Sequence, residues 1–267
     1  MSKIGIFDSG FGGLTVLKGI RKVIPEYDYI YLGDSARTPY GTRSQEVIYK
    51  FTEQAVDYLF DQGCELVVLA CNTASSEALR RIQQEYLIKN HPNKRVLGVV
   101  IPTCEVAIES GYKKVGVMAT SSTVESGSYI REIKKLDDTV DIIQVPCPLL
   151  VPIIESGEIN KDVLSILLDD YLKGLAGNVN AIILGCTHYE IITEEIKKHI
   201  GKTKVIEQSG VVAEKLKSYL KRHPEIETNL SKLGSTLYYS TDITGRFKHF
   251  SEKILGEKFD VKTIELS

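Results

Sequence analysis

Two cysteines, Cys71 and Cys186, each follow closely on a short apolar run of the chain. The runs cover residues 66–69 and 181–184 and are rich in β-branched residues, which is typical of strands buried on both faces of a parallel sheet. Small and polar residues that favour a helix start come after each thiol. Each cysteine is therefore predicted at a strand-to-helix turn, on the sheet edge where open α/β sheets bind ligands. Taken alone, Cys71 favours a buried structural thiol, which is what most free cysteines are.

A pair of thiols on opposite sides of a bound molecule suits inversion at a single carbon atom. One thiolate would remove a proton from one face, and the other thiol would return a proton to the opposite face. The ordinary pKa of cysteine, about 8.5, moves towards neutrality beside a helix N-terminus or a suitable partner, so a thiol could serve as base and as acid. Asp8 and His188 are natural proton partners, although an Asx turn and a helix-start hydrogen bond would also explain them. Developing charge on the substrate would be held by backbone N–H groups and by the hydroxyl groups of Ser9, Thr73, Thr120 and Thr187.

The cysteine segments belong to a longer internal repeat. The chain aligns with itself in three places, in the same order: VVLACNT with IILGCTH, IGIFDSG (4–10) with VGVMATS (115–121), and YIYLGD (29–34) with DIIQVPC (141–147). Three matched strand ends predict a duplication. We therefore expect an α/β fold of two pseudo-symmetric α/β domains with mainly parallel sheets and the active site in the interdomain cleft. The expected first domain is 1–98 plus 211–267, and the expected second domain is 99–210.

Apolar runs and helical periodicity predict the elements that must position these residues. The expected strands cover 3–7, 29–32, 66–69, 95–100, 115–118, 141–147, 181–184, 205–206, 236–239 and 259–264. The expected helices include 44–59, 104–110, 161–175, 211–220 and 246–255, with further helices starting directly after Cys71, where the pattern reaches residue 86, and after Cys186. The last two strands are expected to return to the first domain.

Composition excludes several classes of protein. The 267 residues contain 33 Lys and Arg against 35 Asp and Glu, so no basic excess favours nucleic acid or an anionic membrane surface as a partner. The chain starts without a signal-peptide pattern and has no apolar run of about 18 residues, so a cytoplasmic protein is expected. Five widely spaced cysteines without a CxxC pair predict reduced thiols, with neither a disulfide framework nor a zinc site.

Six motifs in order, FDSGFGG, YLGDSARTPYG, ACNTAS, VVIP, ATSSTVESGSY and LGCTHY, run through most of the chain. Together they resemble the glutamate racemases, which are cofactor-independent members of the aspartate/glutamate racemase superfamily. The resemblance implies interconversion of L- and D-glutamate for peptidoglycan synthesis, with Cys71 and Cys186 as the two acid/base residues. It also implies that no cofactor or metal takes part and that the protein is a homodimer.

Further site residues follow from the resemblance by position. Asp8 and His188 would assist the two thiols, with Glu155 as a weaker third candidate. The residues that would hold the substrate are Ser9, Tyr40, Gly41, Asn72, Thr73, Thr120, Thr123 and Thr187. The sequence departs from the usual family pattern at 190–192, at 206–210 and at 121–122, and none of these departures includes a thiol.

Three other functions compete with this hypothesis. A related racemase acting on aspartate shares the Cys-Asn-Thr motif, but that branch usually has Glu after Cys-Thr, where this chain has His188. A two-lobed binding protein without chemistry would not need a thiol at each matched strand end. A racemase dependent on pyridoxal phosphate would need a lysine for the Schiff base, and no lysine lies at these motif edges.

Overall fold

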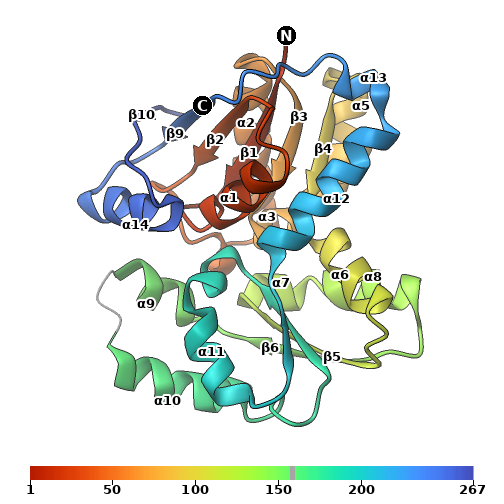
Figure 1. Ribbon diagram of the computed structural model, residues 1–267, viewed down its shortest axis with the longest axis vertical. Coiled ribbons are helices and arrows are strands. Elements are labelled where there is room, and N and C mark those ends of the chain that lie inside the picture. The colour runs from red at the N-terminus through yellow and green to blue at the C-terminus, as the bar shows by residue number, and fades with distance from the viewer. Residues whose placement is uncertain (157–159, 267) are drawn as a thin grey trace.

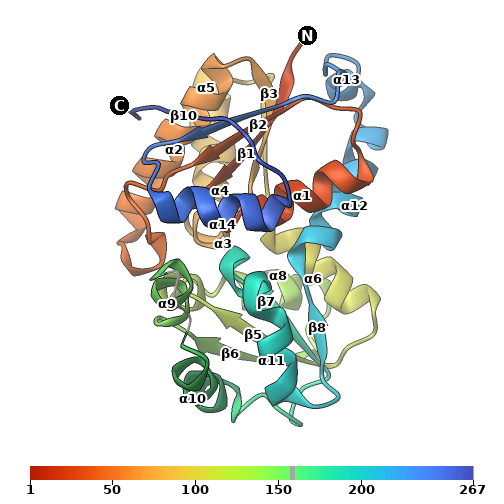
Figure 2. The ribbon, with the colours of Figure 1, turned by 60° about the vertical axis from the view of Figure 1, so that its left-hand side comes forward.

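A computed structural model describes residues 1–156 and 160–266 as an α/β protein built on two parallel sheets (Figures 1 and 2). The larger sheet has the strand order β10-β9-β2-β1-β3-β4 and the smaller sheet the order β6-β5-β7-β8. All strand pairs within them are parallel, which confirms the predicted fold class. The strands are β1 Lys3–Asp8, β2 Tyr29–Gly33, β3 Cys64–Leu69, β4 Arg95–Gly98, β5 Lys114–Ala119, β6 Asp141–Pro146, β7 Ala181–Gly185, β8 Lys204–Ile206, β9 Thr236–Ser240 and β10 Val261–Thr263.

The internal repeat of the sequence is visible in the sheet topology. The order β2-β1-β3-β4 in one sheet corresponds strand by strand to β6-β5-β7-β8 in the other. The aligned sequence pairs fall on β1 and β5, on β2 and β6, and on β3 and β7. Strands β9 and β10 extend the larger sheet beside β2, as expected. We call the larger sheet with its helices the first lobe and the smaller sheet with its helices the second lobe.

Helices cover both faces of each sheet because alternate strand residues point to opposite faces. In β1, Ile4 and Ile6 pack towards α1, α12 and α14, whereas Phe7 packs towards α2 and the helices after Cys71. In the second lobe, α6 and α8 cover one face, and α9, α10 and α11 cover the other. The bounds are α1 Leu14–Val23, α2 Gln45–Asp61, α6 Val100–Glu109, α7 Ser121–Glu125, α8 Ser128–Leu136, α9 Leu150–Ser156, α10 Lys161–Leu172, α11 Thr193–Ile200, α12 Gln208–Arg222, α13 Pro224–Glu227 and α14 Gly245–Leu255.

The segments after the two cysteines differ from the continuous helices that the pattern predicts. After Cys71, α3 (Asn72–Glu77) ends at Ala78 and is followed by α4 (Leu79–Arg81), one π-helical turn η2 (Ile82–Tyr86) and α5 (Leu87–Asn90). After Cys186, the 3-10 helix η3 (Thr187–Ile192) precedes α11. A further 3-10 turn, η1 (Tyr40–Thr42), leads into α2. Periodicity of apolar residues cannot distinguish these helix types, since all of them place similar residues on the buried face.

Several predicted element boundaries are wrong by one to four residues, and three of them lie where the chain passes between the sheets. The strand expected to reach residue 100 ends at Gly98, and the helix expected from residue 104 begins at Val100. Pro102 does not prevent this start, because the first helical turn has no intrahelical N–H bond to lose. Helix α12 begins at Gln208, three residues before the expected start at 211, because a side chain from another element caps it. The backbone N–H groups of Gln208 and Ser209 both donate to Glu190 Oε1.

The chain passes between the lobes twice, from β4 into α6 and from β8 into α12. The carboxyl ends of the two sheets face each other, because residues that follow β1 and β3 contact residues that follow β5 and β7. Within the described ranges, the helices lack the combination of length and apolar character that a membrane-spanning helix requires.

Candidate active site

The two cysteines lie where the repeat places them, at the carboxyl ends of β3 and β7. Cys71 is 5% exposed and Cys186 is 7% exposed, so both thiols are nearly withdrawn from solvent. Cys71 Sγ donates to Ser9 Oγ at 3.4 Å, and Ser9 follows the neighbouring strand β1. Cys186 Sγ lies 3.9 Å from Nδ1 of His188, two residues further along the chain. Each thiol therefore has a polar partner within hydrogen-bond reach.

Glu155 holds the far side of the His188 ring. Its Oε1 lies 2.8 Å from His188 Nε2, and the edge of the ring packs on Phe11 at a centroid distance of 5.2 Å. Burial lowers the pKa of His188, but the hydrogen bonds to Cys186 and Glu155, with their negative charges, outweigh burial and raise it well above its usual value. A protonated ring can then donate from Nδ1 towards Cys186 and from Nε2 towards Glu155.

Asp8 is fully buried between the two lobes. Its Oδ2 accepts a hydrogen bond from the backbone N–H of Gly10 at 3.0 Å, and its Oδ1 accepts one from Thr187 Oγ1 at 3.2 Å. Burial raises the pKa of Asp8, against the opposing effect of the charge on His188. Asp8 therefore closes the turn after β1 and also lies among the ionisable groups of the site.

The same carboxylate affects Cys71. Burial first, and the negative charge of Asp8 second, raise the pKa of the Cys71 thiol to about 12, although the hydrogen bond with Ser9 acts in the lowering direction. Cys71 is therefore held as a neutral thiol at neutral pH, next to a carboxylate that a cation would neutralise.

Three threonines join the lobes beside the thiols. Thr73 Oγ1 of the first lobe lies 3.0 Å from Thr120 Oγ1 and 3.4 Å from Thr123 Oγ1 of the second. Thr120 and Thr123 are also 3.0 Å apart, and Thr120 caps α7 by accepting from the backbone N–H of Thr123. These hydroxyl groups are ready to bond a carboxylate placed among them.

Two glycines allow the lobes to approach this closely. A Cβ atom at Gly12 would lie 2.5 Å from Thr187 Oγ1 and 2.7 Å from His188 Nδ1. A Cβ atom at Gly41 would lie 2.5 Å from the Cβ of Thr120. Both contacts cross from the first lobe to the second, so a side chain at either position would push the lobes apart.

Two predicted substrate-binding side chains are engaged elsewhere. The hydroxyl group of Tyr40 donates to Asp34 Oδ2. The Asn72 carboxamide forms a reciprocal pair with Gln208, with both N–O distances at 2.7 Å, and also accepts from the hydroxyl group of Tyr129 at 2.7 Å. Sequence reasoning assigned no role to Gln208 or to Tyr129, the last residue of the ATSSTVESGSY motif, because their contact with Asn72 arises only in the fold.

The chain is similar to known proteins along nearly its whole length. Residues 14–216 match the family described as Asp/Glu/Hydantoin racemase. A curated glutamate racemase from Aquifex aeolicus (strain VF5) is 38% identical over 261 residues, covering 97% of this chain and 96% of the relative. The crystal structure of a Francisella tularensis glutamate racemase in complex with D-glutamate superposes with a TM-score of 0.88 at 34% identity, covering 99% of this chain and 98% of that one. The Aquifex pyrophilus glutamate racemase structure gives 0.82 at 37% identity, with 98% of both chains covered.

Proposed function

The chain belongs to the Asp/Glu/Hydantoin racemase family, and we propose that it is a glutamate racemase, an isomerase that interconverts L- and D-glutamate. The observation that carries the proposal is the pair of buried thiols at equivalent strand ends of two facing sheets, each with its own polar partner. The curated relatives support glutamate as the substrate, since those named above are glutamate racemases.

In the proposed reaction, Cys71 and Cys186 approach Cα of the substrate from opposite faces. One thiolate takes the α-proton, and the other thiol gives its proton to the opposite face, so the configuration inverts. The roles exchange when the enantiomer reacts. We propose that the protein's own side chains carry both proton transfers, without a cofactor or a metal.

His188 serves the Cys186 side of the proposed reaction. A protonated ring 3.9 Å from Sγ can donate a hydrogen bond to the Cys186 thiolate and stabilise it. Glu155, at 2.8 Å from Nε2, keeps the ring in the orientation that this bond requires. The pair therefore prepares Cys186 to act as the base that removes the α-proton.

Asp8 serves the Cys71 side. The charge of Asp8 contributes to the high pKa of the Cys71 thiol, so neutralising that charge would lower it. The ammonium group of an amino acid placed beside Asp8 supplies this neutralisation. Substrate binding therefore activates Cys71, which stays protonated and unreactive until the ammonium group arrives.

The substrate carboxylates require donors that face the thiols. The threonine group that joins the lobes supplies hydroxyl donors, and the start of α3 supplies free backbone N–H groups. The residues proposed to hold the substrate are Ser9, Tyr40, Gly41, Asn72, Thr73, Thr120, Thr123 and Thr187.

Four further proposals follow from the family. The division into domains is 1–98 plus 211–267 and 99–210, with the substrate in the cleft between them, which the two separate sheets support. The enzyme supplies D-glutamate for peptidoglycan, works in the cytoplasm and forms a homodimer.

The test incubates the purified protein, free of pyridoxal phosphate, with L-glutamate or L-aspartate in D2O and follows optical rotation and deuterium at Cα. Cys71→Ser and Cys186→Ser remove one thiol each. Cys104→Ser is the matched control, because Cys104 is a fully buried thiol that packs in the second lobe against α6 and α8 neighbours.

Racemisation of glutamate with deuterium uptake, lost in both site variants and kept in the control, is the expected result. Turnover of aspartate in place of glutamate would contradict glutamate as the substrate but would agree with the two-cysteine mechanism. Folded protein that exchanges deuterium into neither amino acid would overturn the proposed function.

A further inference from the structure

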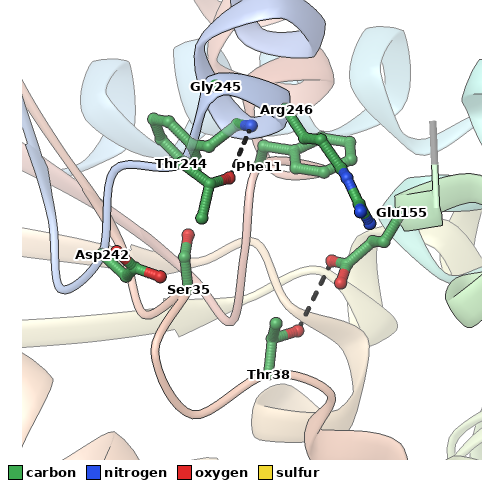
Figure 3. A pocket seen from close by; sticks show the side chains of 9 residues that line it. Phe11, Ser35, Thr38, Glu155, Asp242, Thr244, Gly245 and Arg246 are labelled. Carbon is green, nitrogen blue, oxygen red and sulfur yellow. Dashed lines mark hydrogen bonds between the residues drawn. The ribbon is translucent and has the colours of Figure 1, made fainter.

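A cavity of about 560 Å³ opens beside Phe11 and Glu155, between the loop after β2, helix α9 and the start of α14 (Figure 3). This volume falls in the range of small-molecule sites, about 300–1,000 Å³. The lining residues that matter here are Phe11, Ser35, Thr38, Glu155, Asp242 and Arg246. Sequence reasoning assigned no role to Ser35, Thr38, Asp242 or Arg246.

The cavity shares its inner wall with the catalytic groups. Phe11 packs on the His188 ring, and Glu155 hydrogen-bonds that ring while facing the cavity. Thr38 Oγ1 donates to the same Glu155 oxygen at 3.5 Å, which bridges the first lobe and the second. This contact is much longer than the 2.8 Å bond between Glu155 and His188, so it is the weaker of the two and the easier to part. Both thiols are nearly buried, so a ligand reaches them only after contacts of this kind between the lobes open.

The described lining of the cavity combines one cation with two anions, so a carboxylate that enters it has a single positive group to bind. Arg246 is the only cation among the described residues that line it, and Glu155 and Asp242 are the anions. Figure 3 shows the Arg246 guanidinium group directed towards the Glu155 carboxylate. A dicarboxylic amino acid has a net charge of −1, so Glu155 and Asp242 repel it and Arg246 is the group that attracts it. The forked N–H groups of arginine bind a carboxylate with two parallel hydrogen bonds, and the hydroxyl groups of Ser35 and Thr38 add further donors.

We propose that this cavity is an entry site, in which Arg246 binds a carboxylate of the incoming dicarboxylic amino acid before it passes Glu155 and Thr38 to the thiols. This inference rests on the proposed function. Arg246 acts on capture and does not touch the reacting atoms, so it raises kcat/KM and leaves kcat unchanged. Attraction of this kind increases association rates by about 10 to 1,000-fold and weakens as salt is added.

The experiment measures kcat and kcat/KM for glutamate at low and high ionic strength in the full chain. The variants are Arg246→Gln, which removes the charge, and Arg246→Glu, which reverses it. Lys248→Gln is the matched control, because Lys248 is an exposed cation on the same helix that does not line the cavity. Arg246 is also exposed, and thermal unfolding of each variant verifies the fold.

For Arg246→Gln we expect kcat/KM to fall about tenfold at low salt, with kcat within twofold of the parent and a flatter dependence on salt. For Arg246→Glu we expect a larger fall that added salt partly reverses. Equal kcat/KM in Arg246→Gln and Lys248→Gln would overturn the entry site, and so would a loss confined to kcat. A parent chain that does not racemise glutamate would instead overturn the proposed function, so the two failures are distinguishable.

Discussion

Replacing Gln208 with leucine tests how Asn72, the residue after Cys71, is held in place. Gln208 is fully buried at the start of α12, where the chain returns to the first lobe. It makes three short hydrogen bonds, two with the Asn72 carboxamide at 2.7 Å and one to the Tyr129 hydroxyl group at 2.9 Å. Leucine has a similar volume and cannot form any of them, so packing is kept while the polar network is cut.

The expected fall in the free energy of unfolding follows from the polar groups that Gln208→Leu leaves without hydrogen-bond partners. In Gln208→Leu, Asn72 Nδ2 loses its acceptor, whereas Asn72 Oδ1 keeps the hydrogen bond from Tyr129. A buried donor without an acceptor costs about 1–3 kcal/mol, and each lost neutral hydrogen bond about 0.5–1.5 kcal/mol. These costs overlap, so we expect the free energy of unfolding to fall by about 2–3 kcal/mol. The control Gln83→Leu removes one bond, from Nε2 to the Val96 carbonyl at 2.8 Å, and should cost about 1 kcal/mol.

A double-mutant cycle separates this network from a general effect of the substitution. Urea unfolding is measured for Gln208→Leu, for Asn72→Ala and for the double variant. Once Asn72 is removed, Gln208 has already lost its reciprocal partner, so the double variant should cost less than the two single costs together by about 1 kcal/mol or more. If Gln208→Leu costs as much in the Asn72→Ala chain as in the parent, the reasoning is refuted.

Three further substitutions probe the site. In Glu155→Gln the pKa of His188 should fall, because a neutral amide does not stabilise the imidazolium as a carboxylate does. NMR titration of the imidazole ring measures this pKa, and an unchanged value would contradict the ion pair. The pKa of His188 is higher in the folded than in the unfolded protein, where it is about 6.5, so protonation of His188 stabilises the fold. This stabilisation is fully present below the unfolded pKa and is lost as the pH rises through the folded pKa. In Glu155→Gln the loss should occur at lower pH than in the parent. Asp8→Asn should lower the pKa of the Cys71 thiol from about 12. The assay follows thiolate absorbance against pH, with the spectrum of Cys71→Ser subtracted, and the thiolate should appear at lower pH than in the parent. An unchanged pKa would show that Asp8 does not contribute to the raised value. Gly12→Ala should reduce kcat/KM about 100-fold, because the added Cβ atom separates the lobes. Gly174→Ala is the control, since a Cβ atom there meets open space and should leave kcat/KM unchanged. Equal kcat/KM in the two variants would contradict the close contact at Gly12.

Local sequence signals predicted the parts of the fold that depend on local chemistry. The apolar runs before Cys71 and Cys186 predicted β3 and β7 because strands buried on both faces need continuous apolar residues. The repeat predicted the shared strand order, since similar segments fold into similar units. The start of α12 could not be predicted from local signals, because the residue that caps this helix, Glu190, belongs to an earlier segment of the chain.

The same distinction applies to the candidate site. Asp8, Ser9, Thr73 and the residues after Cys186 lie at strand ends, so their neighbourhood follows from the topology of parallel sheets. Gln208 lies where the sequence departs from the family pattern, and its partner Asn72 is distant in the chain, whereas Arg246 lies in none of the six motifs. Such residues can be recognised as part of the site only when the packing of both lobes is known.

The repeat places the thiols symmetrically, but their ionisable partners break the symmetry. In the aligned segments, Asp8 corresponds to Ala119 and His188 to Thr73, so neither ionisable group has an ionisable counterpart in the other half. On one side the contacts between the lobes include Asp8 with Thr187 and Thr38 with Glu155, and the ionisable groups there are Asp8, His188 and Glu155. On the other side the lobes meet through neutral threonine hydroxyl groups. This division favours a bound amino acid whose ammonium group lies towards Asp8 and whose carboxylate lies among the threonines, so we expect one binding orientation in spite of the duplicated fold.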